Sequence, residues 1–243
     1  MADVKQFPST PSVVIPVLHR GRSCAVVDKP AGLAVESDGP DCVVKLLARQ
    51  LAPPGGRAWP RVVHRLDTGT SGCLAIALNQ RGEKALAQGF LEGEIEKEYL
   101  AVVRGDVPDE GRFDTAYGPD PTDARRHTTR IETPRRARLS WKLVERFVGA
   151  ALVRVQLDTG RTHQIRVQFA EAGFPVLGDA TYRVTANGTF VPDELDVRAA
   201  MPRPALHAAR LAFPDPDGNG IDRRVVEAPM PTDVVSLLDR LRA

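Results

Sequence analysis

The sequence predicts an α+β fold built around a largely antiparallel sheet. Short apolar segments with strand character alternate with amphipathic helical segments along the 243 residues, without the regular rhythm of strand, helix and strand that a parallel sheet requires. With 42% hydrophobic residues, the chain is long enough to bury a large core, and we find no internal repeat.

The first elements lead to a turn that carries an aspartate. Residues 1–20 contain three prolines and little periodicity, which predicts an extended N-terminal arm ahead of one domain over residues 21–243. Residues 23–37 predict a strand, a turn and a second strand, and Asp41 is placed to cap a helix that ends near residue 51. The apolar segments at 61–63 and 73–78 predict two buried strands, which places Asp67 on the turn between them.

The remaining elements continue the mixed pattern. In chain order we expect a helix, a strand, a hairpin of two strands, a helix, a segment that fits helix or strand, and a closing amphipathic helix, over residues 81–93, 97–105, 137–160, 162–173, 204–213 and 231–242. Gly149 marks the turn of the hairpin. Thr162 should cap the helix that follows the hairpin, and Gly173 should end it.

The distribution of charged residues along the chain says more about a binding partner than the net charge does. The formal net charge of +2 and a pI near 8.5 are weak signals, but one segment concentrates basic residues against only Glu132 and Glu145. These residues are Arg125, Arg126, Arg130, Arg135, Arg136, Arg138, Lys142 and Arg146. Such a segment fits a nucleic-acid contact or an ordinary solvated loop equally well, since arginine outnumbers lysine throughout the chain.

Cysteine usage and hydropathy indicate a cytoplasmic protein. The cysteines Cys24, Cys42 and Cys73 have no spacing typical of a disulfide framework or a structural zinc site. No segment resembles a signal peptide or a membrane span. The histidines and carboxylates have no convincing metal-ligand spacing either, so we expect no metal and no cofactor.

Two Asp-Thr-Gly triplets, at Asp67 and Asp158, raise the hypothesis of an aspartic protease. Such a dyad needs two similar lobes that place two carboxylates about 3 Å apart around a shared proton. The segments around the two triplets are dissimilar, and Arg161 next to the second triplet would favour ionisation of both acids. Asp-Thr-Gly is also common in turns, so the triplets alone carry little weight.

A wider window around Asp67 shows a different pattern. The stretch HRLDTGTSGCLAIAL at 64–78 resembles the signature loop of the RluA-type pseudouridine synthases. Four further stretches resemble motifs of the same family in the same order: VVDKPAGLAV at 26–35, KEYLAVVRG at 97–105, GRTHQIRVQFAEAGFPVLGDATY at 160–182 and ALHAARLAF at 205–213. The resemblance covers about residues 22–230.

The resemblance implies an enzyme that isomerises uridine within structured RNA, ribosomal or transfer RNA, in an RNA-binding cleft and without cofactor or metal. Asp67 matches the nucleophile or base, Arg166 its ion-pair partner, and Tyr99 the ring that stacks on uracil and can take its carbon-bound proton. The target base must leave its stack, and Arg65 matches the residue that fills the vacated space.

Further residues are expected around the substrate. Ile165 and Leu206 match apolar walls of the uracil pocket, although core packing explains them equally well, and Arg161 matches a residue that holds the loop or a phosphate. We also assign substrate contacts to His64, Arg125 and Arg126, whereas His163 and His207 should be architectural. No membrane or obligatory protein partner is implied, and a monomer suffices. A catalytically idle RNA-binding module on the same fold is the alternative.

Two features depart from the family pattern. Thr68 and Gly69 replace a charged pair that many members carry after the aspartate. The residues ahead of the domain are too few for the small N-terminal RNA-binding module of many members, so we expect the catalytic domain itself to select its substrate.

Overall fold

The computed structural model describes residues 13–39, 41–52, 56, 58–183, 201–219 and 222–243. The strands are β1 (Val17–Arg20), β2 (Cys24–Lys29), β3 (Arg61–Val62), β4 (Ser71–Ala77), β5 (Glu96–Arg104), β6 (Glu110–Ala116), β7 (Gly118–Pro119), β8 (His127–Thr128), β9 (Arg136–Phe147), β10 (Ala150–Leu157), β11 (Leu206–Pro214) and β12 (Arg223–Glu227). The helices are α1 (Val43–Gln50), α2 (Gln80–Glu92), α3 (Gln164–Glu171) and α5 (Thr232–Arg242).

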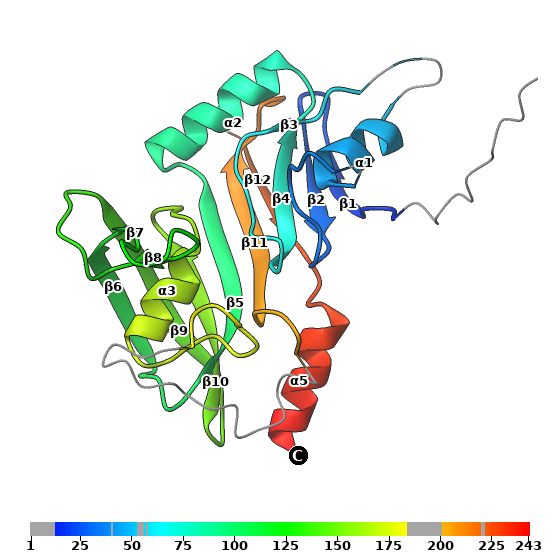
Figure 1. Ribbon diagram of the computed structural model, residues 1–243. Coiled ribbons are helices and arrows are strands. Elements are labelled where there is room, and N and C mark those ends of the chain that lie inside the picture. Colours follow the sequence, from blue (N-terminus) through cyan, green and yellow to red (C-terminus); the bar gives the residue numbers. More distant parts are fainter. Residues whose placement is uncertain (1–12, 40, 53–55, 57, 184–200, 220–221) are drawn as a thin grey trace, which may run out of the picture.

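A ten-stranded mixed sheet runs through the described part of the chain, and β7 and β8 form a separate two-stranded antiparallel sheet. The strand order of the larger sheet is β1-β2-β4-β11-β5-β10-β9-β6, with β12 paired to β11 and β3 paired to β4. All of these pairs are antiparallel except β4 with β11. The α+β class with a largely antiparallel sheet is therefore confirmed (Figure 1).

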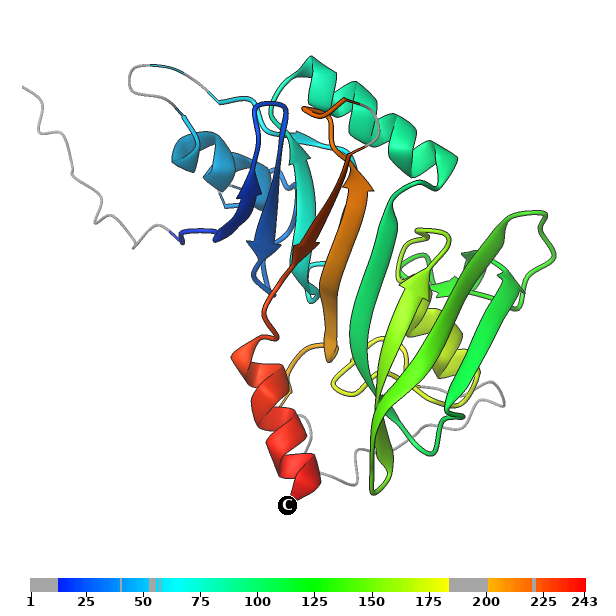
Figure 2. The ribbon, with the colours of Figure 1, turned by 180° about the vertical axis from the view of Figure 1, so that it is seen from behind.

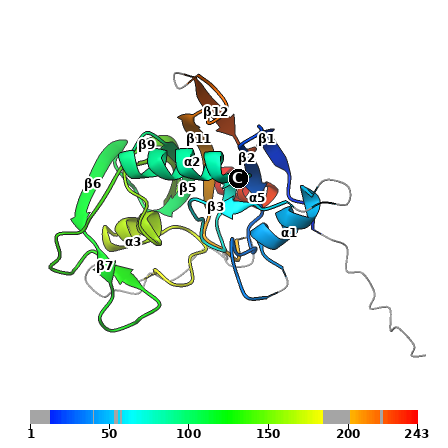
Figure 3. The ribbon, with the colours of Figure 1, turned by 90° about the horizontal axis from the view of Figure 1, so that it is seen from above.

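The helices α1 and α3 cover the same face of this sheet, over its two halves. Both lie in front of the strands in Figure 1, and the strands lie in front of them when the molecule is seen from behind in Figure 2. The view from above separates the two helices along the sheet (Figure 3). The largest apolar cluster joins the central strands to buried side chains of α1, α3 and α5, among them Leu47, Phe169 and Leu237.

The Thr-Ser-Gly sequence after Asp67 has a packing reason. Gly72 has a φ of 108° where β4 meets β11, and a Cβ atom there would collide with the backbone of Ala208. Only glycine combines this φ with so close an approach of two backbones. The parallel pairing of β4 with β11 thus depends on Gly72 and fixes the end of the Asp67 turn.

Several expectations need correction. The second strand expected within residues 23–37 is absent, because the chain leaves the sheet after β2 and follows a turn into a loop. Cys42 rather than Asp41 precedes α1, and His163 rather than Thr162 precedes α3; neither residue caps its helix with a side-chain hydrogen bond. Both helices are held mainly by burial of their apolar side chains, which reduces the need for a cap.

Other expectations are met or extended. The hairpin turns at Gly149 with a φ of 72°, and the ambiguous segment at 204–213 is the central strand β11. Residues 17–20, assigned to the arm, form β1 and pair with β2, while residues 1–12 lie outside the described residues. The strands β6, β7, β8 and β12 were not among the expected elements. No described helix is both long and apolar enough to cross a membrane.

Candidate active site

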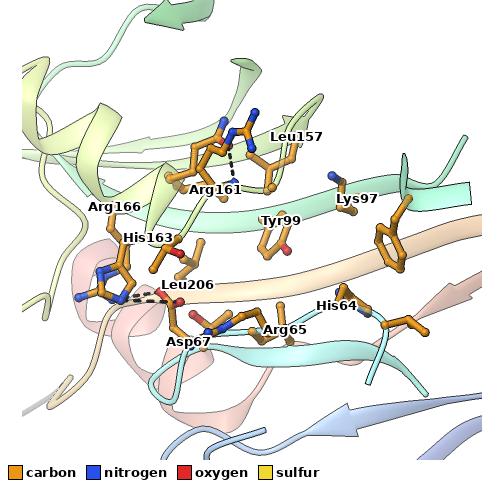
Figure 4. Close-up of a pocket in the computed structure, with 18 residues that line it drawn as sticks. His64, Arg65, Asp67, Lys97, Tyr99, Leu157, Arg161, His163, Arg166 and Leu206 are labelled. Carbon is orange, nitrogen blue, oxygen red and sulfur yellow. Dashed lines mark hydrogen bonds and ion pairs between the residues drawn. The ribbon is translucent and has the colours of Figure 1, made fainter. Parts of the chain in front are cut away.

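A cavity of about 310 Å³ opens where four motifs converge. Its walls come from the turn between β3 and β4, from β5, from the loop ahead of α3 and from the start of β11 (Figure 4). Eight of the ten expected site residues line it: His64, Arg65, Asp67, Tyr99, Arg161, Ile165, Arg166 and Leu206. Arg125 and Arg126 are absent from its lining.

Local hydrogen bonds hold the turn of Asp67 in place. The Thr70 amide donates to the Asp67 carbonyl at 2.9 Å, and the Gly32 amide donates to the Thr68 carbonyl at 2.8 Å. Beneath the turn, the fully buried Lys29 ammonium donates to the carbonyls of Thr68, Pro30 and Leu33 at 3.2, 2.9 and 2.7 Å. The Lys-Pro-Ala-Gly stretch thus supports the catalytic loop through a lysine.

Burial lowers the pKa of Lys29 to about 8, against the opposing effect of the nearby Asp67 charge. Its three carbonyl acceptors suit the ammonium form, which has three donors. Lys29 is therefore a positioning residue for the turn.

Arg166 joins two carboxylates across the floor of the cavity. Its Nη1 donates to Asp67 Oδ2 at 3.0 Å, while its Nε and Nη2 donate to the two oxygens of Asp179 at 2.6 and 3.0 Å. Burial by itself would lower the pKa of this guanidinium, but Asp179 and Asp67 raise it above its usual value. A cation thus lies in direct contact with the Asp67 carboxylate at the floor of the cavity.

Asp179 fixes the orientation of Arg166. This carboxylate is 1% exposed and also accepts hydrogen bonds from the Thr181 and Tyr182 amides at 2.8 and 3.2 Å. The preceding Gly178 has a φ of 75°, and a Cβ there would collide with the Arg203 carbonyl. The Gly-Asp pair thus places an acid behind the arginine, in a backbone conformation that favours glycine.

A second set of contacts places His163 beside Asp67. The Tyr182 hydroxyl accepts a hydrogen bond from the His127 amide at 3.0 Å and lies 2.9 Å from His163 Nδ1. Because the hydroxyl is already an acceptor, its own proton can be donated to Nδ1, which places the imidazole proton on Nε2. That Nε2 lies 3.9 Å from Asp67 Oδ1.

The backbone of His163 is unusual for its residue type. Its φ of 57° is the only positive value among the non-glycine residues that the structure describes. Burial lowers the pKa of His163, the Asp67 charge opposes this effect, and the Arg166 charge adds to it. A left-handed histidine at the start of a helix, aimed at a carboxylate, is the kind of strained position that clusters at functional sites. His163 thus makes a hydrogen bond with Tyr182, as an architectural residue would, and its ring also lies beside Asp67.

Tyr99 and two apolar side chains form the walls next to Asp67. Tyr99 is 8% exposed, and Ile165 and Leu206 are 3% and 4% exposed. Burial raises the pKa of the Tyr99 phenol, and the Asp67 charge adds to this effect. Tyr99 therefore stays a neutral phenol at neutral pH, and its ring lines the same cavity as the Asp67 carboxylate.

The other expected contacts differ in how tightly they are held. His64 Nε2 accepts the Ala75 amide at 2.9 Å, and its ring packs against Phe90 with centroids 4.5 Å apart. Arg161 Nε donates to the Arg136 carbonyl at 3.1 Å, in keeping with the expected loop-holding role. Arg65 is exposed, and no described residue forms an ion pair with it.

His207 follows Leu206 on β11 and does not line the cavity, because successive side chains of a strand point to opposite faces of the sheet. Its Nε2 faces the Ala228 carbonyl at 3.3 Å and its Nδ1 faces Ser71 Oγ at 3.0 Å. The carbonyl can only accept, so Nε2 carries the proton and Ser71 donates to Nδ1. These bonds tie β11 to its neighbours, as an architectural histidine should.

The basic segment contains arginines that are paired within the protein. Arg125 pairs with Asp123 at 3.0 Å, and Arg136 pairs with Asp114 at 2.8 Å. Arg126 instead lies over the Tyr182 ring at 5.3 Å, on the periphery of the active site. Part of the segment's charge is therefore neutralised within the protein.

Lys29, His163, Asp179 and Tyr182 were not among the expected catalytic or binding residues. All four lie inside stretches quoted for the family resemblance, which is the signal that could have found them. Asp158 is exposed at the end of β10 and does not line the cavity, so the two Asp-Thr-Gly triplets do not form a proton-sharing pair.

Solved structures show the class of protein to which this fold belongs. The structure of human RNA pseudouridylate synthase domain containing 4 matches with a TM-score of 0.73 at 22% identity and covers 93% of both chains. Human RNA pseudouridylate synthase domain containing 1 matches with a TM-score of 0.72 at 26% identity and covers 98% of both chains.

Sequence comparisons identify the family. The family model described as RNA pseudouridylate synthase matches residues 23–171, and the chain belongs to this family. Ribosomal large subunit pseudouridine synthase D of Nitrosomonas europaea is 32% identical over 95% of the chain and 66% of the relative. The protein of the same name from Xylella fastidiosa is 34% identical over 100% of the chain and 74% of the relative.

The length of the match varies among the relatives. The chain spans 62–66% of the length of the synthase D proteins from Nitrosomonas europaea and Neisseria meningitidis.

Proposed function

We propose that the protein isomerises specific uridines in structured RNA to pseudouridine, with Asp67 as the reacting carboxylate. The observation that carries this proposal is the Asp67–Arg166 ion pair at the floor of the cavity, with the Tyr99 ring beside it. This constellation fits a reaction that needs an ionised acid, a flat surface for a base, and a pocket that excludes water.

The reaction is an isomerisation, so atoms and electrons balance within the substrate. Asp67 attacks C1′ of the ribose or removes a ribose proton, and the bond between N1 of uracil and C1′ breaks. The uracil anion turns between the apolar walls until C5 faces C1′. A C5–C1′ bond then forms as the carboxylate is released or, on the second route, as Asp67 returns the ribose proton. The C5 proton is lost to solvent and N1 gains a proton from solvent.

The structure supports a stacking role for Tyr99. A phenol whose pKa is raised by burial and by Asp67 is mostly protonated at neutral pH, which makes it a poor acceptor for the C5 proton. Ile165 and Leu206 would confine the uracil on its other sides.

Access to the cavity requires the target nucleotide to leave the RNA stack, at a cost of a few kcal/mol. Arg65 supports this step because its side chain is exposed, without an ion-pair partner among the described residues, and only two residues from Asp67. We assign to it the space that the flipped base leaves behind.

Ribosomal RNA is the substrate class that the relatives favour, since several are named ribosomal large subunit pseudouridine synthase D. Transfer RNA is the second candidate from the sequence resemblance. Asp67, Tyr99 and Arg166 line one cavity of this chain. We infer a monomer that acts on RNA in the cytoplasm.

Release of tritium from RNA labelled at C5 of uracil tests the reaction. We expect release by the wild-type protein and a loss of more than about a thousandfold with Asp67→Asn, which removes the nucleophile. Release by Asp67→Asn at the wild-type rate would refute the assignment of Asp67. Absence of release by the wild type from both ribosomal and transfer RNA would favour the idle RNA-binding module. Mapping pseudouridines in RNA from cells that lack the protein would then identify the uridine.

A further inference from the structure

The cavity carries more positive charge than the catalytic pair explains. Among its lining residues, Arg65, Lys97, Arg161 and Arg166 are cations and Asp67 is the single carboxylate. Arg166 is committed to Asp67 and Asp179, and Arg161 to a backbone carbonyl. The remaining positive charge favours an anion in the cavity, in addition to a neutral uracil ring.

Among the cations of this cavity, Lys97 is the one that is partly buried without a partner in the described part of the chain. It is partly buried, yet its ammonium forms neither a hydrogen bond nor an ion pair within 4.0 Å with any residue that the structure describes. Burial lowers the pKa of Lys97, and Asp158 opposes this effect from beyond ion-pair distance. An unpaired, partly desolvated ammonium is unfavourable unless a ligand supplies its counter-charge.

The strand β5 sets the distance between Lys97 and the uracil site. Lys97 and Tyr99 are two residues apart on this strand, so their side chains emerge on the same face with Cα atoms about 7 Å apart. Figure 4 shows Lys97 and His64 at one end of the cavity, Asp67 and Arg166 at the other, and Tyr99 between them. A separation of this size is comparable to the step from one nucleotide to the next along a single strand.

The surroundings of Lys97 would strengthen its attraction for an anion. The ring pair of His64 and Phe90 forms an apolar wall at the same end of the cavity. Gly160 also lies beside Lys97, where a Cβ atom would stand 3.7 Å from the ammonium. Because Lys97 lines a cavity of about 310 Å³ next to this apolar wall, a phosphate that enters the cavity can reach the ammonium in a partly water-excluded place.

We propose that Lys97 binds the backbone phosphate next to the flipped uridine, and so forms a second subsite beside the uracil pocket. This inference rests on the proposed function, because it takes RNA as the ligand. Lys97 is then a substrate-binding residue that sets how far the strand enters the cavity. It takes no part in breaking the glycosidic bond.

Binding of a labelled nine-nucleotide oligouridylate at several salt concentrations tests the subsite. We expect Lys97→Met to weaken binding about five- to tenfold, as removal of one charge-assisted hydrogen bond should. The slope of log Kd against log salt should fall by about 0.7, the value for one phosphate of a single strand. Lys97→Arg should keep the slope, and so should the matched control Lys84→Met, which removes an exposed lysine of α2 outside the cavity.

An oligouridylate with neutral methylphosphonate linkages distinguishes a phosphate contact from a base contact. Wild type and Lys97→Met should bind this probe equally. If Lys97→Met weakens both probes by the same factor, Lys97 contacts a base or a ribose and the proposal is wrong. Unchanged affinity and slope with the phosphodiester probe would also overturn it. Lys97→Gln takes the place of Lys97→Met if the methionine variant does not fold.

Tritium release separates this inference from the proposed function. With the subsite correct, Lys97→Met should raise KM for C5-tritiated RNA more than it lowers kcat. A fall in kcat with unchanged binding would overturn the subsite alone. A wild-type protein that releases no tritium, but whose oligouridylate binding depends on Lys97, would overturn the isomerase and retain the phosphate contact.

Discussion

Nη1 of Arg166 lies 3.0 Å from Oδ2 of Asp67, and this contact leaves the rest of the guanidinium for a second carboxylate. Asp179 accepts hydrogen bonds from both Nε and Nη2, so the guanidinium is held in a fixed direction while its Nη1 faces Asp67. The planar fork of arginine is suited to this arrangement, because one side chain can satisfy two acids in fixed directions.

Loss of the charge on Asp179 should therefore reduce catalysis, although Asp179 itself does not contact the substrate. We expect Asp179→Asn to lower kcat about 10- to 100-fold, since a displacement of Arg166 of about 1 Å misaligns Asp67. Asp215 offers a matched control. This buried carboxylate accepts a hydrogen bond from Arg224 at 2.7 Å, and it does not line the cavity. Asp215→Asn should lower stability and leave kcat unchanged. Equal kcat for Asp179→Asn and wild type would contradict the positioning role.

Removal of the Lys29 ammonium should destabilise the Asp67 turn. Lys29→Met leaves three backbone carbonyls without their donor in a fully buried place, so we expect a loss of about 3 kcal/mol or more in the free energy of unfolding. Lys45 makes the same kind of contact to three carbonyls on the surface. Lys45→Met should cost less than about 1 kcal/mol, because water can take the place of the ammonium. Denaturant unfolding measures both; similar losses would show that burial of Lys29 is unimportant.

His64 should make stability depend on pH below neutrality. Burial lowers its pKa to about 3 in the folded protein, and an unfolded histidine titrates near 6.5. Below pH 6.5 the unfolded chain binds a proton that the folded chain does not, so stability falls as pH falls. Between pH 7.5 and 5.0 this group should account for about 2 kcal/mol. His64→Gln keeps an acceptor for the Ala75 amide and should lose that part of the dependence, whereas an unchanged pH profile would contradict the assignment.

The basic segment should bind RNA mainly through arginines that no carboxylate neutralises. Replacement of Arg125, Arg126, Arg135 and Arg136 by alanine should weaken RNA binding and flatten its salt dependence. Arg125 and Arg136 already pair with carboxylates, whereas Arg126 and Arg135 form no ion pair with a described carboxylate. We therefore expect Arg126→Ala with Arg135→Ala to reproduce most of the effect, with a slope reduced by about one for each phosphate that the protein no longer neutralises.

The control pair for this prediction is Arg125→Ala with Arg136→Ala. It removes the same formal charge but should change binding much less. Unchanged binding in the fourfold variant would assign the segment to a solvated loop. Equal effects of the two pairs would show that the internal ion pairs do not matter.

Much of the fold could be predicted from local patterns. The apolar runs on both sides of Asp67 form β3 and β4, and the hairpin turns at Gly149 with positive φ. Patterns failed where tertiary contacts outweigh local preference. The apolar residues after Pro30 pack against the core from a loop, and α3 begins at a left-handed histidine rather than at the hydroxyl cap of Thr162. The alternation of exposed residues along β6 is that of a half-covered edge strand, which has no strong signal of its own.

The sequence by itself determined the class of fold and the family resemblance, and it singled out Asp67, Tyr99 and Arg166 as candidate catalytic residues, because the motifs and their order can be recognised without coordinates. Only the tertiary structure showed that Asp179 and His163 lie around Asp67 and Arg166. It also showed that Lys97 lines the same cavity without a partner among the described residues. These relationships join residues up to 99 positions apart, as Asp67 and Arg166 are. Distance, burial and shared hydrogen bonds arise when the sheet brings separate motifs together, and no local pattern encodes them.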